Sequence, residues 1–217
     1  MESPAPHSSL IPNFLLKSFY KLLYHQLYWT YDSVAAMVSF GRWNEWVRST
    51  LTDLKGPRIL EIGHGPGHLL VAMSQAGFRP IGLDASRWMS HLAQRRLRKA
   101  GFQPALINGY TQYTCFQSGA FDQVVATFPA EYIFDPLTTK EIYRILAPAG
   151  YWVILCAART IGKSILQRTF ARILNSSSKM EMIQNLLVLP FEQVGFRVEV
   201  DERFSSTSKL LIIKAFK

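Results

Sequence analysis

The stretch Glu61-Ile62-Gly63-His64-Gly65-Pro66-Gly67 follows an apolar run over residues 58–62 and precedes a helical pattern over residues 69–76. Glycines at alternate positions allow the backbone to turn tightly and to approach a ligand closely. The helix that follows offers free N–H groups at its first turn. Glu61 stands at the carboxyl end of the apolar run, beside this loop. The stretch therefore predicts a strand, a ligand-binding loop and a helix in succession.

Two features argue against the dinucleotide site that glycine loops often form. That site requires Gly-x-Gly-x-x-Gly. Gly63 and Gly65 fit this spacing, but His68 occupies the third glycine position and Gly67 comes one residue early. The end of the chain also predicts an antiparallel pair of strands, which an all-parallel dinucleotide-binding sheet lacks. A nicotinamide cofactor is therefore disfavoured.

Asp84 ends a second predicted strand over residues 80–84, about twenty residues after the glycine loop. A carboxylate at this place can accept hydrogen bonds from both hydroxyl groups of a ribose. Asp84 is followed by Ala85 and Ser86, and aspartate is also common as a helix cap. Together with the glycine loop, Asp84 favours a nucleoside ligand.

The remaining pattern predicts an α/β fold of the Rossmann-like type. Further strands are predicted over residues 105–108, 121–127 and 151–157, and helices over residues 89–100 and 137–146. Apolar strands that alternate with helices indicate a parallel sheet covered on both faces. The last two strands, over residues 197–204 and 210–216, are separated only by Ser205–Lys209, which is too short for a crossover helix. We therefore expect a seven-stranded, mostly parallel sheet that ends in an antiparallel hairpin.

With these motifs, the chain resembles class I methyltransferases that depend on S-adenosylmethionine (SAM), particularly the group related to quinone-biosynthesis methylases. The resemblance covers roughly residues 28–216. It rests on Glu61–Gly67, on Asp84-Ala85-Ser86, on Phe121-Asp122-Gln123-Val124-Val125, on Leu146-Ala147-Pro148-Ala149-Gly150 and on Gly195-Phe196. The resemblance implies the class I methyltransferase fold, SAM as methyl donor and transfer of a methyl group to a small acceptor.

The resemblance also implies which residues bind SAM. In that family the acidic-glycine loop borders the methionine end, the acid of the second strand holds the ribose, and the loop after the fourth strand lies beside the methyl group. The residues at these positions are Glu61, Gly63, His64, Gly65, Gly67, Asp84, Ala85, Ser86, Tyr110, Thr111 and Thr127. His64 and His68 can line the pocket or act as a base, and the donor-binding role of the loop favours the pocket wall or helix start. Thr127, Glu131 and Tyr132 can face the acceptor, but no catalytic residue is assigned and no metal site is predicted.

The chain departs from the family pattern in three places. Family members often carry Gly-Asp-Ala after the third strand, where the acid contacts the adenine amino group, and this chain has Gly109-Tyr110-Thr111. Tyr110 can stack on adenine instead, or the contact can come from the backbone. The usual Leu-Pro-Phe is Thr114-Cys115-Phe116, and the usual Pro-Gly-Gly is Pro148-Ala149-Gly150. The missing acid leaves an alternative open, a catalytically idle SAM-binding or scaffold protein.

Composition limits the partners of this protein. The chain has 217 residues, of which 48% are hydrophobic, and a net charge of +9. The densest basic run, Arg95, Arg96, Arg98 and Lys99, predicts the solvated face of a helix. The sequence shows no interleaving of basic and aromatic residues of the kind that indicates nucleic-acid binding. Cys115 and Cys156 predict buried thiols in a reducing compartment, which favours a cytoplasmic protein.

The alternation of strands and helices suggests that the chain divides into two parts. These are an N-terminal helical extension or lid, residues 1–54, and a methyltransferase domain, residues 55–217, with a helical insert at about 159–190. The extension is predicted to hold helices over residues 13–31 and 34–54. Lys17, Lys21 and His25 form a narrow polar stripe on the first helix, and they argue against a signal peptide and a transmembrane helix. That helix is interpreted as a lid packed on the core or as a peripheral membrane contact. Large apolar side chains in both parts predict an apolar acceptor, lipid-like or quinone-like.

Gly162-Lys163-Ser164 follows a predicted strand, as the end of a phosphate-binding P-loop would. That motif requires a first glycine where this chain has Ala157. No acid suited to Mg²⁺ accompanies it. We therefore interpret Lys163 as a solvated residue at the start of a helix.

Overall fold

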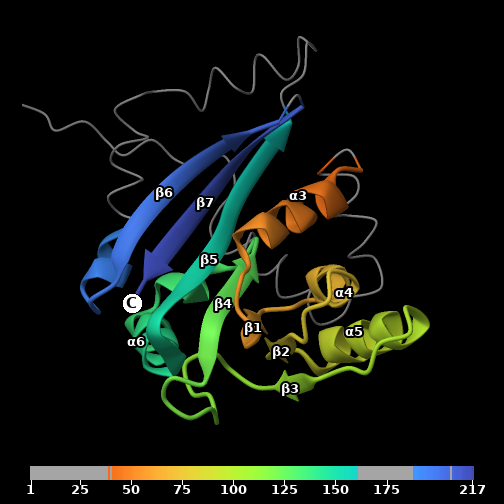
Figure 1. Cartoon of the computed structure of the whole chain (residues 1–217), viewed down its shortest axis with the longest axis horizontal. Coiled ribbons are helices and arrows are strands. Elements are labelled where there is room, and N and C mark those ends of the chain that lie inside the picture. The colour runs from red at the N-terminus through yellow and green to blue at the C-terminus, as the bar shows by residue number, and fades with distance from the viewer. Residues whose placement is uncertain (1–38, 40, 161–187, 206) are drawn as a thin grey trace, which may run out of the picture.

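The computed structural model describes residues 39, 41–160, 188–205 and 207–217. Its sheet contains seven strands in the order β3-β2-β1-β4-β5-β7-β6 (Figure 1). The strands are β1 (Ile59–Ile62), β2 (Ile81–Asp84), β3 (Leu106–Asn108), β4 (Phe121–Thr127), β5 (Leu146–Thr160), β6 (Arg197–Phe204) and β7 (Ser208–Phe216). Strands β1 to β5 pair in parallel, and β7 is antiparallel to both β5 and β6. The predicted sheet and its terminal hairpin are confirmed.

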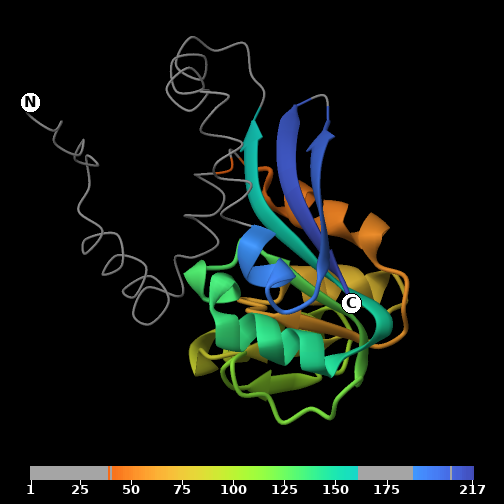
Figure 2. The ribbon, with the colours of Figure 1, turned by 90° about the vertical axis from the view of Figure 1, so that its left-hand side faces the viewer.

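Helices cover both faces of the sheet, as predicted (Figure 1 and Figure 2). They include α3 (Trp43–Ser49), α4 (His68–Gln75), α5 (Arg87–Lys99) and α6 (Pro136–Ile145), with 3₁₀ turns η2 (Thr50–Asp53) and η3 (Glu131–Phe134). Alternate residues of the strands point to two hydrophobic clusters. One cluster contains side chains of α3, α4 and α5, and the other contains side chains of α6 together with Phe191 and Phe196. All four residues of β1 are buried because the strand is covered from both sides.

Side-chain caps fix where two of the helices begin. Ser86 Oγ accepts a hydrogen bond from the backbone N–H of Met89 at 3.3 Å, at the start of α5. Asp135 Oδ1 accepts one from the N–H of Leu137 at 2.9 Å, and Pro136 occupies the first position of α6. Such caps satisfy N–H groups that the helix itself leaves without partners. Both helices therefore start directly at the loops that follow β2 and β4.

The chain before β1 is joined to the hairpin at the end of the sheet. Asp53 is buried, and its carboxylate lies 3.0 Å from Arg203 Nη2 on β6 and 2.8 Å from Lys214 Nζ on β7. Trp46 Nε1 donates a hydrogen bond of 2.8 Å to Ser208 Oγ. These contacts hold α3 and η2 against the hairpin.

Two predicted elements differ from the structure by more than two residues. Strand β5 begins at Leu146 and not at Tyr151, and it continues to Thr160, where it pairs with Ser208. In the described part of the second predicted helix, residues 34–54, there is a turn at Gly41, whose φ is 78°, and α3 begins after that turn. Residues 1–38, most of the predicted insert and Gly162-Lys163-Ser164 lie outside the described residues, so the division into extension, domain and insert stays a prediction.

The thiol of Cys115 is exposed, so the prediction that it is buried is wrong. The neighbouring Phe116 turns inward and packs edge-on against Phe121 with ring centroids 4.7 Å apart. Adjacent side chains of an extended segment point to opposite sides, which leaves Cys115 facing outward. Cys156 is half-buried on β5, and burial raises the pKa of its thiol to about 12.

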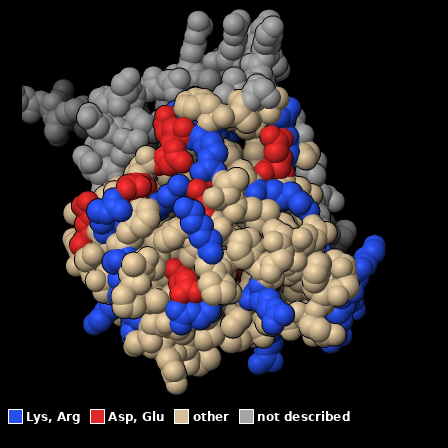
Figure 3. Space-filling model, in the orientation of Figure 1, with Lys and Arg blue, Asp and Glu red and all other residues tan. Residues whose placement is uncertain are grey.

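Basic side chains are distributed among acidic and uncharged ones on the face shown in Figure 3. Arg95, Arg98 and Lys99 on α5 are exposed, as the charge run predicts, but Arg96 is partly buried. Within the described parts of the chain, no helix is both long enough and apolar enough to cross a membrane.

Candidate functional site

The glycine loop connects β1 to α4 at the carboxyl edge of the sheet. Gly63, Gly65 and Gly67 have φ values of 62°, 52° and 84°, a backbone region that side chains with a Cβ atom disfavour. The N–H of Gly63 donates to the carbonyl oxygen of Leu83 at 2.8 Å, which ties the loop to β2. The predicted glycine loop is therefore present and is held at the ends of two neighbouring strands.

Two of the glycines also provide space. A Cβ atom at Gly67 would lie 2.8 Å from the Cβ atom of Ala93, so the absence of a side chain lets α4 pack closely on α5. A Cβ atom at Gly63 would collide with the hydroxyl group of Tyr132. The hydroxyl of Tyr132, from η3, is thus brought directly over the glycine loop.

Asp84 links the end of β2 to the glycine loop. Its Oδ2 accepts a hydrogen bond from the N–H of Gly65 at 2.8 Å, and its Oδ1 accepts one from the N–H of Ser86 at 2.8 Å. A carboxylate has about four acceptor positions, so each oxygen retains one for a ligand. The structure brings Asp84, Ser86 and the loop together as the sequence predicts.

Glu61 lies at the end of β1 with only 1% of its surface exposed. Its Oε2 has no hydrogen-bond partner among the described residues. Burial, and next the negative charge of Asp84, raise the pKa of Glu61 well above its ordinary value. A buried carboxyl oxygen without a partner beside a glycine loop suits a cation or a hydrogen-bond donor brought by a ligand.

His64 supports the loop from beneath. Its Nδ1 lies 2.7 Å from the carbonyl oxygen of Gly65, which can only accept, so Nδ1 carries the hydrogen. Nε2 lies 3.5 Å from Ser90 Oγ, and the ring packs on Gly82, where a Cβ atom would come within 2.8 Å. Burial lowers the pKa of His64, although the charge of Asp84 opposes this shift. These contacts fix the position of the His64 ring, whereas His68 begins α4 and is partly exposed.

The residues after β3 lie beside the end of β2. The N–H of Gly109 and the side-chain amide of Asn108 both donate to the carbonyl oxygen of Asp84, at 3.1 and 2.8 Å. Tyr110, the next residue, is 68% exposed, and Thr111 is buried. An exposed aromatic ring at this edge is available to stack on a flat ligand.

The loop after β4 contains a backbone feature that the sequence does not reveal. Phe128 follows Thr127 and has a φ of 47°, in the left-handed region that costs a non-glycine residue roughly 1–2 kcal/mol. Its ring packs against Trp43 and Trp46 of α3, with centroids 4.4 and 6.1 Å away. This strained turn directs the following residues, including Tyr132, back over the glycine loop. No local signal in the sequence predicts it, because the stabilising rings come from a distant segment.

The described residues contain no group of three or more His, Cys, Asp or Glu side chains that could hold a metal ion.

The sheet order, the acidic-glycine loop after β1 and the acid at the end of β2 define a class I methyltransferase fold. Residues 59–150 match the family model described as a methyltransferase domain. The demethylmenaquinone methyltransferase of Oceanobacillus iheyensis is 26% identical over 136 residues, 59% of this chain and 57% of that protein. The demethylmenaquinone methyltransferase of Thermus thermophilus is 31% identical over 132 residues, 58% of this chain and 60% of that protein. The matches thus span less than two thirds of either relative.

A solved structure agrees in fold. Phosphoethanolamine N-methyltransferase 2 of Haemonchus contortus, in complex with S-adenosyl-L-methionine, superimposes with a TM-score of 0.59 at 20% identity, covering 92% of this chain and 60% of that chain. Residues 59–150, less than half of the chain, are thus similar to a methyltransferase domain, and the solved structure shows that the chain shares the fold of that neighbour.

Proposed function

We propose that this protein binds SAM at the carboxyl edge of β1 and β2 and transfers its methyl group to a small acceptor. The observation that supports this most is the buried Oε2 of Glu61, which has no partner among the described residues. SAM carries an ammonium group at its methionine end and two ribose hydroxyl groups. Glu61 would pair with the ammonium group, and the remaining acceptor positions of Asp84 would hold the ribose.

The other predicted contacts follow from the same placement. Gly63, His64, Gly65 and Gly67 would form the wall against the methionine end. Ala85 and Ser86 follow the ribose acid, and Tyr110 and Thr111 would contact adenine, with the ring of Tyr110 replacing the missing acid. Thr127 would lie beside the methyl group. These roles are proposals that rest on the geometry of the loop and on the family.

Bound SAM supplies a methyl group on a positively charged sulfur, which is already activated for displacement. The acceptor atom attacks the methyl carbon opposite the sulfur, the carbon–sulfur bond breaks, and S-adenosylhomocysteine remains. The protein mainly has to align the acceptor and exclude water. We propose that the strained turn at Phe128 and the hydroxyl of Tyr132 perform this alignment, since both belong to the loop that lies over Gly63. No side chain is assigned as a base.

The acceptor that we propose is small and apolar, of the phenol or quinol class. Three relatives bear the name demethylmenaquinone methyltransferase. The aromatic rings of Trp43, Trp46 and Phe128 gather where the loop after β4 turns back. Peripheral membrane contact through residues 13–31 is a further prediction. Liposome flotation of the whole chain against a deletion of residues 1–31 would test it, and equal absence of binding would contradict it.

The second candidate function is a catalytically idle SAM-binding or scaffold protein. The observation that favours it is the exposed Tyr110, which stands where the family pattern has an acid that contacts adenine. Turnover distinguishes the two candidates. Binding of SAM without methyl transfer to any member of a panel of phenols and quinols would favour the idle protein.

Calorimetric titration of SAM, and separately of NADH, tests the donor site. The variant Asp84→Asn keeps the size of the side chain but removes its charge and one acceptor oxygen. We expect SAM to bind the wild type and to bind this variant at least tenfold more weakly, about 1.4 kcal/mol. Asp201→Asn on β6 makes the same chemical change far from the loop and should bind SAM normally. Binding of NADH in place of SAM would refute the proposal.

A further inference from the structure

One five-residue pattern follows both α4 and α5. It reads Ala76-Gly77-Phe78-Arg79-Pro80 after α4 and Ala100-Gly101-Phe102-Gln103-Pro104 after α5. In both copies the glycine has a positive φ, 90° and 84°, and the N–H of the phenylalanine donates to a carbonyl oxygen of the last helical turn at 3.0 Å. This is a common way for a helix to end at glycine. Because β2 and β3 follow as neighbouring parallel strands, both copies lie at the amino edge of the sheet.

A pocket of about 350 Å³ lies between the two helix ends. Small-molecule sites have volumes of about 300–1,000 Å³ and mainly apolar walls. The hydroxyl of Ser74, which also lines the pocket, already donates to the carbonyl oxygen of Leu70 at 2.9 Å. The apolar residues of the described lining include both phenylalanines of the repeated pattern: Leu70, Phe78, Pro80, Leu97, Phe102 and Ala105. These walls suit an apolar group, and an aromatic ring in particular, because rings pack favourably against phenylalanine.

Arg79 and Gln103 occupy the same position in the two copies, and both line the pocket. Each precedes a proline, which favours an extended backbone at that residue. Neither side chain forms a hydrogen bond or ion pair within the described part of the chain. A guanidinium group can hold both oxygens of a carboxylate, and the amide of Gln103 can donate a further hydrogen bond. The polar groups of the pocket therefore suit a carboxylate.

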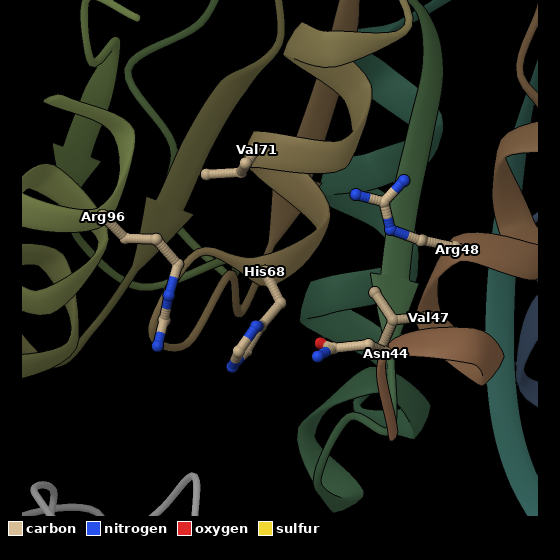
Figure 4. A pocket seen from close by; sticks show the side chains of 6 residues that line it. All are labelled: Asn44, Val47, Arg48, His68, Val71 and Arg96. Atoms are coloured by element: carbon tan, nitrogen blue, oxygen red, sulfur yellow. The ribbon is translucent and has the colours of Figure 1, made fainter. Parts of the chain in front are cut away.

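The arginines of a smaller pocket, at the other end of α4, are engaged with the protein instead. That pocket measures about 150 Å³, and Figure 4 shows Arg96 beside His68 at the start of α4 with Arg48 reaching across from α3. Arg48 Nη2 donates to Gln75 Oε1 at 2.6 Å, and Arg96 Nη1 donates to the carbonyl oxygen of Pro66. A ligand that pairs with Arg79 would displace no bond of this kind among the described residues.

We propose that the pocket between the ends of α4 and α5 binds a small aromatic carboxylate. Its ring would lie against Phe78 and Phe102, and its carboxylate would pair with Arg79 and accept a hydrogen bond from Gln103. Glu61 and Asp84 stand at the carboxyl ends of their strands, so this site is separate from the proposed donor site. It does not depend on methyl transfer and can be tested whether or not the proposed function is right.

Calorimetric titration of 3-phenylpropionate at constant ionic strength tests the proposal. We expect one molecule to bind per chain. 3-Phenylpropanamide has the same shape without the charge and should bind about fivefold more weakly, as expected for an ion pair at the rim of a pocket. Acetate, which lacks the ring, should not bind measurably. Absence of binding of 3-phenylpropionate, or equal binding of the acid and the amide, would overturn the proposal.

Arg79→Gln removes the charge at the rim of the pocket. We expect this variant to bind 3-phenylpropionate about fivefold more weakly and 3-phenylpropanamide as the wild type does. Arg95→Gln is the matched control, because Arg95 is exposed on α5 and is not among the described lining residues. Both variants should keep the melting temperature of the wild type. An equal loss in the two would show that the acid responds to the overall positive charge of the protein, which would contradict the site.

Ala105→Phe tests the position of the ring. Ala105 lines the pocket and is exposed, so a larger side chain can occupy the pocket without entering the core. We expect binding of both 3-phenylpropionate and 3-phenylpropanamide to be lost at an unchanged melting temperature. Unchanged binding of both probes would place the ring elsewhere and would overturn the proposal.

Titration in the presence of saturating S-adenosylhomocysteine tests whether the two sites are separate. We expect 3-phenylpropionate to bind the complex as well as the free protein. Competition between the two ligands would place the aromatic acid in the donor site and would overturn the proposal. If S-adenosylhomocysteine itself does not bind, the proposed function fails, whereas the titrations of Arg79→Gln and Ala105→Phe still decide whether the pocket binds the aromatic acid.

Discussion

At the scale of single residues, Glu61 shows how a ligand site can oppose stability. Ionisation of a carboxyl group that is 1% exposed and lies near Asp84 is unfavourable in the folded protein, and this raises its pKa. A residue chosen only for stability at this position would be apolar or an amide with partners. A ligand with a positive charge would reverse the balance, because it supplies the partner that Oε2 lacks among the described residues.

Glu61→Gln should weaken SAM binding while leaving the fold intact. The amide retains the size of the side chain but cannot carry the charge that pairs with an ammonium group. We expect S-adenosylhomocysteine to bind this variant about tenfold more weakly, or about 1.4 kcal/mol. 5′-Methylthioadenosine, which has no ammonium group, should bind the variant and the wild type equally well. Calorimetry of both ligands checks this, and equal weakening of the two would show that Glu61 acts through the loop and not through the ammonium group.

Ala149 is a second residue whose conformation is locally unfavourable. Its φ is 60°, and the family pattern has glycine at this position, between Pro148 and Gly150. Ala149→Gly should raise the free energy of unfolding by about 0.5–1 kcal/mol, because glycine adopts this conformation without a steric penalty. The greater flexibility of glycine in the unfolded chain reduces the gain. Urea unfolding measures the change, with the exposed Ala157→Gly on the same strand as control. Destabilisation by Ala149→Gly as large as in the control would show that the turn is not strained.

At the scale of elements, the contacts of Asp53 join the start of the described chain to its end. A charged group with 6% side-chain exposure requires partners, and Arg203 and Lys214 provide them from two different strands. Sequence alone could not pair these residues, since roughly 150 positions separate them and each is ordinary in its own segment.

Asp53→Asn should loosen this junction. The variant leaves Arg203 and Lys214 close together without the carboxylate that they share, and we expect a loss of about 1–3 kcal/mol in the free energy of unfolding. Asp201→Asn is the matched control, because Asp201 pairs with the same arginine at 3.3 Å but is 42% exposed. Its effect should stay within about 0.5 kcal/mol. Urea denaturation checks both, and equal effects would show that burial of Asp53 does not matter.

The elements themselves were largely predictable, because period-2 and period-3.6 patterns report burial directly. The strands at residues 121–127 and 197–204 agree with the structure residue for residue. Strand β5 was predicted too short at both ends. Pro148 and Gly150 suggest an interruption of regular structure, but β5 pairs with β4 on both sides of them. The extension of β5 to Thr160 depends on its pairing with β7, some fifty residues later in the sequence.

At the scale of the whole molecule, the candidate site consists of two parts. The ends of the strands could be predicted from the sequence, whereas the course of the loop after β4 could not. Glu61, the glycines and Asp84 come together because parallel strands bring their carboxyl ends to one edge. The position of Tyr132 over Gly63 depends instead on the left-handed turn at Phe128, which is held by rings of α3. Arg96 was predicted as one of several solvated charges, and only the tertiary structure distinguishes it from its neighbours.

The pH dependence of stability should report Glu61 on the scale of the whole protein. Its pKa is raised in the folded state above the ordinary value of 4.5. Above that value the unfolded chain releases a proton that the folded protein still holds, so stability falls as pH rises, by at most about 1.4 kcal/mol per pH unit. The fall ends once pH exceeds the folded pKa. His64 acts on the acid side, because its lowered pKa makes stability fall as pH drops below 6.5.

Comparison with Glu61→Gln isolates the carboxyl group from every other titration. The stability of the variant relative to the wild type should increase as pH rises above 4.5 and level off once pH exceeds the folded pKa of Glu61, in urea unfolding series at matched salt. Saturating S-adenosylhomocysteine should reduce this advantage, because its ammonium group stabilises the ionised form of Glu61 only in the wild type. A difference between the two proteins that does not change with pH would mean that Glu61 ionises normally in the folded state. A ligand effect that is equal in both would place the ammonium group away from Glu61.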